Sequence, residues 1–141
     1  MATTTKWATP GSRSSNIAST TLDSLANGSS SAFVTYDNST NLDLYAVVTL
    51  KLGSLNPTTG AGVKLHVFTT DGTDTPDNTA SVGGGEIYPE PLTTGSGAKV
   101  VNFRIRLHPH SMRLCVTNNS NVSFAASGNE LYVKPNNEAS S

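Results

Sequence analysis

Residues 41–55, NLDLYAVVTLKLGSL, form the stretch that decides the fold class. Apolar side chains occupy every second position of it: Leu42, Leu44, Ala46, Val48, Leu50 and Leu52. The positions between them are mostly polar and include Asp43, Thr49 and Lys51. Successive side chains of a β-strand point to opposite faces of a sheet. The alternation therefore predicts a strand with one buried face and one largely solvated face.

The same alternation recurs on both sides of this strand, and no long stretch has the period of an amphipathic helix. Six further strands are predicted at residues 31–38, 62–70, 98–108, 112–116, 121–126 and 129–135, with a weak one near residues 20–26. Segments rich in Gly, Asn, Asp and Pro separate these strands, and such residues favour turns. Eight strands separated by turns predict an all-β chain, an antiparallel two-sheet β-sandwich of jelly-roll type.

Two polar segments without periodicity flank the predicted sandwich. The sandwich spans residues 17–134, between an extended N-terminal arm at residues 1–16 and an extended C-terminal tail at residues 135–141. The alternation also predicts the members of the core, which are Leu44, Val48, Leu50, Leu65, Val67, Phe103, Ile105 and Leu114.

Residues 104–116, RIRLHPHSMRLCV, contain two of the three histidines and the only cysteine. The apolar positions are odd before Pro109 and even after it, and a one-residue slip turns every side chain to the opposite face. Proline also cannot donate to a central ladder. We therefore expect a turn or bulge at residues 108–111, with His108 and His110 exposed at a corner, where they are candidates for contact with a partner.

A metal site at this corner is not expected. His108 and His110 have a spacing that suits zinc, but zinc needs three or four ligands. Cys115 alternates against Leu114 and Val116, so it is expected to face outward elsewhere on the strand. Asp71, Asp74 and Asp77 do not match a calcium loop, and Gly83–Gly85 neither follows nor opens a helix as a phosphate loop requires. No cofactor, metal or catalytic set is predicted, and the chain is not expected to be an enzyme.

Composition excludes several kinds of partner. Only 13% of the residues are charged and the formal net charge is -1, so neither a nucleic-acid footprint nor a polybasic membrane segment is expected. A single cysteine forms no internal disulfide. The N-terminal residues resemble no secretory signal, and no apolar run is long enough to span a membrane. The four N-x-[ST] sequons, at Asn27, Asn38, Asn118 and Asn121, are interpreted as turns in a protein made in a cytoplasm.

Two further features are candidate partner-binding elements. Pro89 and Pro91 interrupt pairing at alternate positions, which places Tyr88 and Glu90 on an exposed or edge segment. That segment either protects a sheet edge or contacts a neighbouring subunit. Trp7 is the only tryptophan and lies in the polar arm, where an aromatic side chain either anchors a partner or docks on its own domain.

Three segments carry a resemblance to a family of known proteins: residues 14–55, 65–78 and 116–138, which include SSNIASTTLDSLANG, LHVFTTDGTDTPDN and VTNNSNVSFAASGNELYVKPNNE. In overall texture they resemble the capsid cement (decoration) proteins of tailed bacteriophages, in particular the jelly-roll cement proteins of podophages such as the Bordetella phage. The resemblance covers most of the chain, from about residue 14 to residue 138.

The resemblance implies a homodimer or homotrimer that binds the major capsid protein on the exterior of the virion, after synthesis in the host cytoplasm. The alternative is a β-sandwich associated with the phage tail or fibre that binds host glycans. Such a protein should expose an aromatic cluster, whereas only 6% of the residues are aromatic and they are scattered along the sequence.

Overall fold

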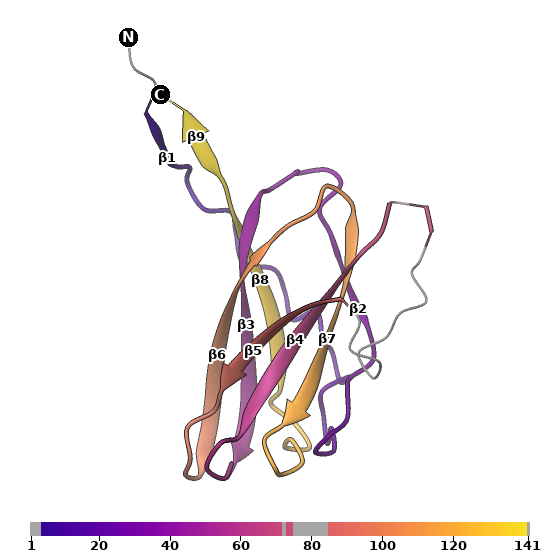
Figure 1. Cartoon of the computed structure of the whole chain (residues 1–141), viewed down its shortest axis with the longest axis vertical. Coiled ribbons are helices and arrows are strands. Elements are labelled where there is room, and N and C mark those ends of the chain that lie inside the picture. The colour runs from indigo at the N-terminus through magenta and orange to yellow at the C-terminus, as the bar shows by residue number, and fades with distance from the viewer. Residues whose placement is uncertain (1–3, 72, 75–84, 141) are drawn as a thin grey trace.

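The computed structural model describes residues 4–71, 73–74 and 85–140, and within them the chain is all-β (Figure 1). These residues form nine strands and no helix: β1 (Thr5–Trp7), β2 (Val34–Asp37), β3 (Tyr45–Leu55), β4 (Gly62–Thr69), β5 (Glu86–Pro91), β6 (Gly97–Arg106), β7 (Ser111–Asn119), β8 (Glu130–Asn136) and β9 (Glu138–Ser140). The prediction of an all-β chain is confirmed.

The strands form two main sheets, and every pairing is antiparallel, as predicted. The order is β2-β7-β4-β5 in one sheet and β6-β3-β8 in the other. Their inner faces share one hydrophobic core, so the two sheets lie against each other as in a β-sandwich. β1 and β9 form a separate two-stranded ribbon, which extends from one end of the body and carries both chain ends (Figure 1). We call it the terminal ribbon.

The strand pairings are nested in sequence, so that each pair encloses the next one. β4 pairs with β5, β3 pairs with β6, and β2 pairs with β7. Outside these, residues 8–17 follow β8: the N–H groups of Gly11, Ser14 and Ile17 donate to the carbonyls of residues 135, 133 and 131. Most of the segment expected as an N-terminal arm thus lies along the outer edge of β8.

The core contains the predicted residues with one exception. Val48, Leu50, Leu65, Val67, Phe103, Ile105 and Leu114 are all buried. Leu44 is 44% exposed, and Leu42, which has the same parity, is 55% exposed. The strand begins only at Tyr45, and Leu42 has a positive φ of 53° within the preceding turn. Parity applies only where the backbone is extended, so the prediction for Leu44 was wrong.

The histidine corner has the predicted turn, but His108 and His110 are half-buried rather than exposed. β6 ends at Arg106 and β7 begins at Ser111, and the apolar side chains on both strands face the core despite the change of parity. Cys115 points away from the sandwich core, as its parity predicts, yet this side chain is only 1% exposed. It lies opposite His66, and His66 and Phe68 are also buried on this outer face.

Two predicted strands are absent. Residues 20–26 form turns, in which Ser24 has a positive φ, and residues 121–126 form a loop. The two segments are joined by hydrogen bonds from the Phe124 N–H to the Leu25 carbonyl and from the Ser24 N–H to the Ala125 carbonyl. Leu22 and Phe124 are nevertheless buried in the core. These loops close one end of the sandwich with apolar side chains, which explains their strand-like sequence pattern.

Candidate functional site

The terminal ribbon is fixed to the body at its root. Trp7 lies opposite Glu138 in the ribbon, and the Ala8 N–H donates to the Asn137 carbonyl at 2.8 Å. The Asn137 side chain accepts a hydrogen bond from the Leu44 N–H at 2.6 Å and donates to the Asp43 carboxylate at 2.7 Å. Asn137 therefore joins the ribbon to the loop before β3.

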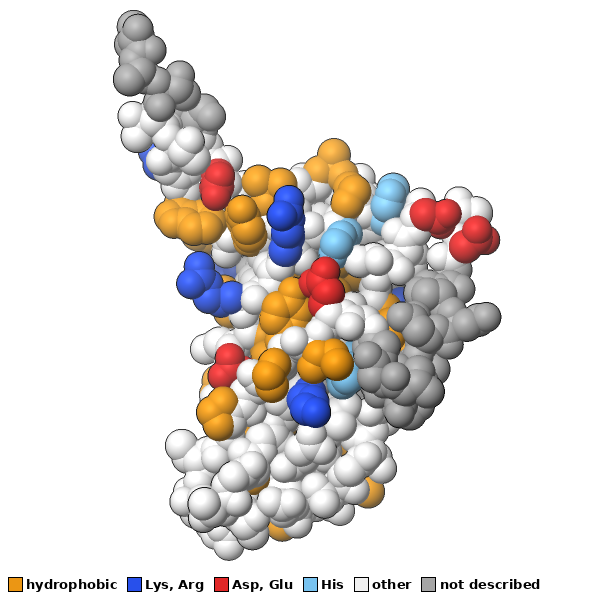
Figure 2. Space-filling model, viewed as in Figure 1, with side chains coloured by type: hydrophobic (Ala, Val, Ile, Leu, Met, Phe, Trp, Pro, Cys, Tyr) orange, Lys and Arg blue, Asp and Glu red, His pale blue; other side chains and the backbone are white. Residues whose placement is uncertain are grey.

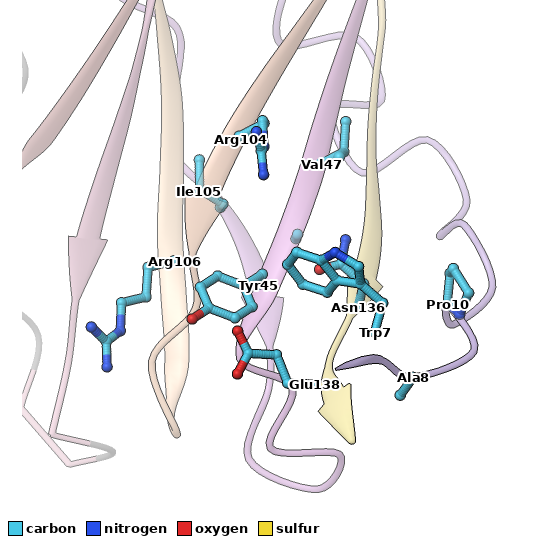
Figure 3. A pocket seen from close by; sticks show the side chains of 11 residues that line it. Trp7, Ala8, Pro10, Tyr45, Val47, Arg104, Ile105, Arg106, Asn136 and Glu138 are labelled. Carbon is cyan, nitrogen blue, oxygen red and sulfur yellow. The ribbon is translucent and has the colours of Figure 1, made fainter. Parts of the chain in front are cut away.

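A groove of about 840 Å³ lies between the ribbon and the outer face of the β6-β3-β8 sheet. Trp7 and Tyr45 meet there edge to face, with ring centroids 5.7 Å apart (Figure 3). Trp7 remains 58% exposed despite this contact. Trp7 thus contacts its own domain and still presents most of its surface to solvent, so it retains the surface that a partner would contact.

Strand register explains which side chains surround the groove. Tyr45 is flanked by Arg106 of β6 and Asn136 of β8, and Val47 is flanked by Arg104 of β6. The odd residues of β3 from Tyr45 to Lys51 and the even residues of β6 and β8 point outward, because their neighbours in sequence are the ones that face the core. The groove therefore combines aromatic and aliphatic surface with exposed guanidinium groups, a combination that suits binding (Figure 3).

The predicted strip Tyr88–Pro91 lies in β5, which is an edge strand, as expected. β4 approaches it closely, since a side chain at Gly62 would meet the Glu90 carbonyl at 2.8 Å. Pro89, Glu90 and Pro91 line a shallow hollow of about 390 Å³. The prolines occupy a strand whose second edge is unpaired within the described residues, so they cost little ladder bonding.

His108 and Tyr88 meet at Glu86. One Glu86 oxygen lies 3.4 Å from His108 Nε2, and the other accepts a hydrogen bond from the Tyr88 hydroxyl at 2.6 Å. Burial, followed by this contact with Glu86, raises the pKa of Tyr88 to about 12, while the Arg106 backbone acts in the opposite direction. Because Arg106 also lines the groove, the Tyr88 cluster adjoins it.

His110 lies apart from this cluster, near Asp71. The Asp71 carboxylate accepts hydrogen bonds from the Thr73 and Asp74 N–H groups, at 2.8 and 2.7 Å. These two N–H groups lower the pKa of Asp71, and His110 lowers it further. This geometry is that of an Asx turn. Asp77, Gly83 and Gly84 of the motifs considered above lie outside the described residues.

Within residues 4–71, 73–74 and 85–140, no group of three or more His, Cys, Asp or Glu side chains is placed to hold a metal ion. The same part of the chain contains no helix with the length and hydropathy needed to cross a membrane.

Sequence reasoning missed a set of buried asparagines that hold the loops. Asn38 donates from Nδ2 to the carbonyls of Asp43 and His108, and thereby ties the loop before β3 to the histidine corner. Asn118 and Asn129 bind loop carbonyls in the same way at the other end. Two of these, Asn38 and Asn118, are sequon asparagines. The sequence did contain a signal for this role: these asparagines lie beside turn segments, and Asn side chains readily form hydrogen bonds with nearby backbone.

A scan against protein-family models, a search of curated proteins and a search of solved structures each found no match to this chain.

Proposed function

We propose that this chain is a non-enzymatic structural protein of a tailed-phage virion, which binds the outer surface of the capsid and stabilises it. The observation that carries the proposal is the terminal ribbon with its groove, where Trp7 is fixed to the body and still largely exposed. Aromatic side chains that fill a partner's pocket supply much of the energy of an interface. A cement protein needs such complementary surface rather than a reactive site.

The nested strand pairing supports a jelly-roll fold, which is the fold that the family resemblance implies. Seven strands of the body pair as β4 with β5, β3 with β6, and β2 with β7, and β8 completes the second sheet. An eight-stranded jelly roll needs one further strand beside β8. Residues 8–17 occupy that place through their hydrogen bonds to the backbone of β8.

The proposed partners are the major capsid protein and a second or third copy of this chain, on the exterior of the capsid. Linked copies that engage several capsid subunits gain avidity even where each contact is weak. The edge strip at Pro89–Pro91 and the corner histidines are proposed as further contact residues. The strip lies on the edge strand β5 and His108 lies beside it, whereas His110 lies near Asp71 at the same corner.

Binding of purified protein to empty heads, assembled from the capsid protein of the same phage, tests the proposal. We expect co-sedimentation of the wild-type protein, weakened at least tenfold by Trp7→Ala, which corresponds to about 1.4 kcal/mol per site. Leu42→Ala is the matched control, because Leu42 is an apolar residue with an exposure similar to that of Trp7 and lies outside the groove and the edge strip. Wild-type protein that does not bind heads would contradict the proposal.

One observation favours the second candidate, a tail-associated protein that binds host glycans. The structure brings Trp7 and Tyr45 together beside Asn136 and Glu138, although these residues are scattered in the sequence. Aromatic rings beside polar groups also suit a sugar. Binding to host glycans that depends on Trp7 and Tyr45, together with no binding to heads, would favour this candidate over the cement protein.

A further inference from the structure

Basic side chains are concentrated on the outer face of the β6-β3-β8 sheet. Register and exposure place Arg104 and Arg106 of β6, Lys51 of β3 and Lys134 of β8 there. Arg13 of the neighbouring segment joins them, because its guanidinium lies 4.0 Å from the centre of the Tyr132 ring on the same face. We call these five residues the basic face.

The net charge of -1 does not reveal that basic and acidic residues lie on different parts of the surface. The basic face holds five of the nine Lys and Arg residues, and Glu130 is the one carboxylate that alternates with them on the three strands. The other four cations are outnumbered by the remaining nine carboxylates. The sheet face is therefore strongly positive relative to the rest of the molecule, and the surface potential of such a face attracts negative partners.

The charges on this face are largely uncompensated within the molecule. Lys51 pairs with Glu130 at 3.2 Å, but in the described part of the chain no carboxylate oxygen lies within 4.0 Å of Arg104, Arg106 or Lys134. Arg104 and Lys134 lie on either side of Val47, one strand away in each direction. Like charges held on one small face repel each other, and a partner of opposite charge would relieve that repulsion.

We infer that the basic face docks an acidic surface of a partner protein, and that the groove beside it receives an apolar side chain of the same partner. Figure 2 shows apolar and basic side chains next to each other below the terminal ribbon. Guanidinium groups match carboxylates in geometry. The inference rests on the proposed function, in which the partner is the capsid.

A protein fits this surface better than an anionic polysaccharide. The row of cations is interrupted across the strands: Val47 lies between Arg104 and Lys134, and Tyr45 lies between Arg106 and Asn136. The groove next to them is lined by Trp7 and Ile105 as well as by arginine. An interface core that is apolar and surrounded by charge is typical of contacts between proteins.

The test is a double charge reversal, Arg104→Glu with Arg106→Glu, compared with Arg113→Glu. Both arginines of the double variant are exposed, and Arg113 lies on the outer face of the other sheet, so the control reverses a charge without touching the basic face. Each variant is first compared with wild type by circular dichroism and thermal unfolding. Three probes are then titrated at low and high salt: poly-L-glutamate, dextran sulfate, and empty heads of the same phage.

We expect the double variant to lose at least tenfold in affinity for poly-L-glutamate and for heads, with Arg113→Glu near wild type, and binding of wild type to weaken at high salt. Binding of poly-L-glutamate through the basic face without binding of heads would leave the inference standing and refute the proposed function. Heads bound equally well by wild type and the double variant would overturn the inference and leave the proposed function standing. Failure of wild type to bind poly-L-glutamate, or preference for dextran sulfate over it, would also overturn the inference.

Discussion

Replacement of Asn118 by alanine should destabilise the fold more than any surface change of similar size. Its amide donates to the carbonyls of Leu25 and Val122, both at 2.8 Å. Its carbonyl oxygen accepts from the N–H and the hydroxyl of Ser120, at 2.9 and 2.6 Å. Both residues are fully buried.

The magnitude follows from those four hydrogen bonds. Each contributes about 0.5–1.5 kcal/mol net. The Leu25 carbonyl keeps its bond from the Phe124 N–H, and in the variant the single proton of the Ser120 hydroxyl is free to bond to the Val122 carbonyl, which limits the loss. The Ser120 N–H loses its acceptor in a buried site. We expect Asn118→Ala to lower the free energy of unfolding by about 3 kcal/mol, which corresponds to a Tm lower by roughly 10 °C for a chain of this size.

Urea and thermal unfolding, followed by circular dichroism, measure this effect. Asn119→Ala is the control, since Asn119 is adjacent in sequence but only half-buried. Its replacement should change the free energy of unfolding by less than about 0.5 kcal/mol. If the two variants unfold alike, the asparagine does not hold the loops between β7 and β8, and the account of the buried amides is wrong.

Three further outcomes are expected. Ile105→Ala should cost about 2–5 kcal/mol of stability in urea unfolding, whereas Leu44→Ala at an exposed position should cost less than about 0.5 kcal/mol; similar losses would contradict the assigned parity. Burial raises the pKa of Cys115 to about 11, and that of Tyr88 is about 12, so the folded state holds both protons more tightly than the unfolded state. Stability should therefore be constant below about pH 9 and fall as the pH rises toward 11 and 12, with a shallower fall in Cys115→Ala; no pH dependence in this range would refute the assignment. Because Trp7 is the only tryptophan and contacts Tyr45, Tyr45→Ala should shift its emission to longer wavelength, while Tyr132→Ala should not.

Much of the sandwich could be predicted because its strands are half-buried. In β3 the buried positions follow the two-residue period from Ala46 to Leu52, and the period shifts only before Leu55, where the register is irregular. The same period fails at Leu42 and Leu44, where the backbone turns and an Asn38 side chain replaces strand pairing. Periodicity reports burial only where the backbone is regular, so the boundary of a strand is harder to predict than its interior.

The failures at residues 20–26 and 121–126 have a different cause. Leu22 and Phe124 are as buried as strand residues, yet their two segments are joined by hydrogen bonds from Phe124 to Leu25 and from Ser24 to Ala125, and the buried Asn118 side chain bonds to Leu25. A short apolar pattern cannot distinguish a strand from a loop that closes the end of a core. For Cys115 the parity gave the correct direction but not the burial, because Cys115, His66 and Phe68 are all buried on the outer face of their sheet.

The candidate site depends on contacts that no local pattern contains. Trp7 reaches Tyr45 only because β1 pairs with β9 and the Asn137 side chain fixes the root of that ribbon. β1 and β9 come from opposite ends of the sequence and become neighbours only in the folded chain. Sequence reasoning could therefore name Trp7 as an anchor while leaving open what it contacts.

The basic face shows the same limit for electrostatics. Arg104 and Lys134 are far apart in the sequence and belong to a chain whose net charge is -1, so composition alone suggested no charged surface. They share a face because β6 and β8 pair with the same strand, in registers that align both residues with Val47. At physiological salt, exposed charges interact over about 8 Å. Neighbouring strands lie about 4.7–4.9 Å apart, so the backbones of Arg104 and Lys134, two strands apart, are separated by little more than the distance over which exposed charges interact, and both cations act on a partner that docks between them. Charge segregation in a β-sandwich is therefore a property of register, and reversing two arginines on one strand should change the field of the whole face.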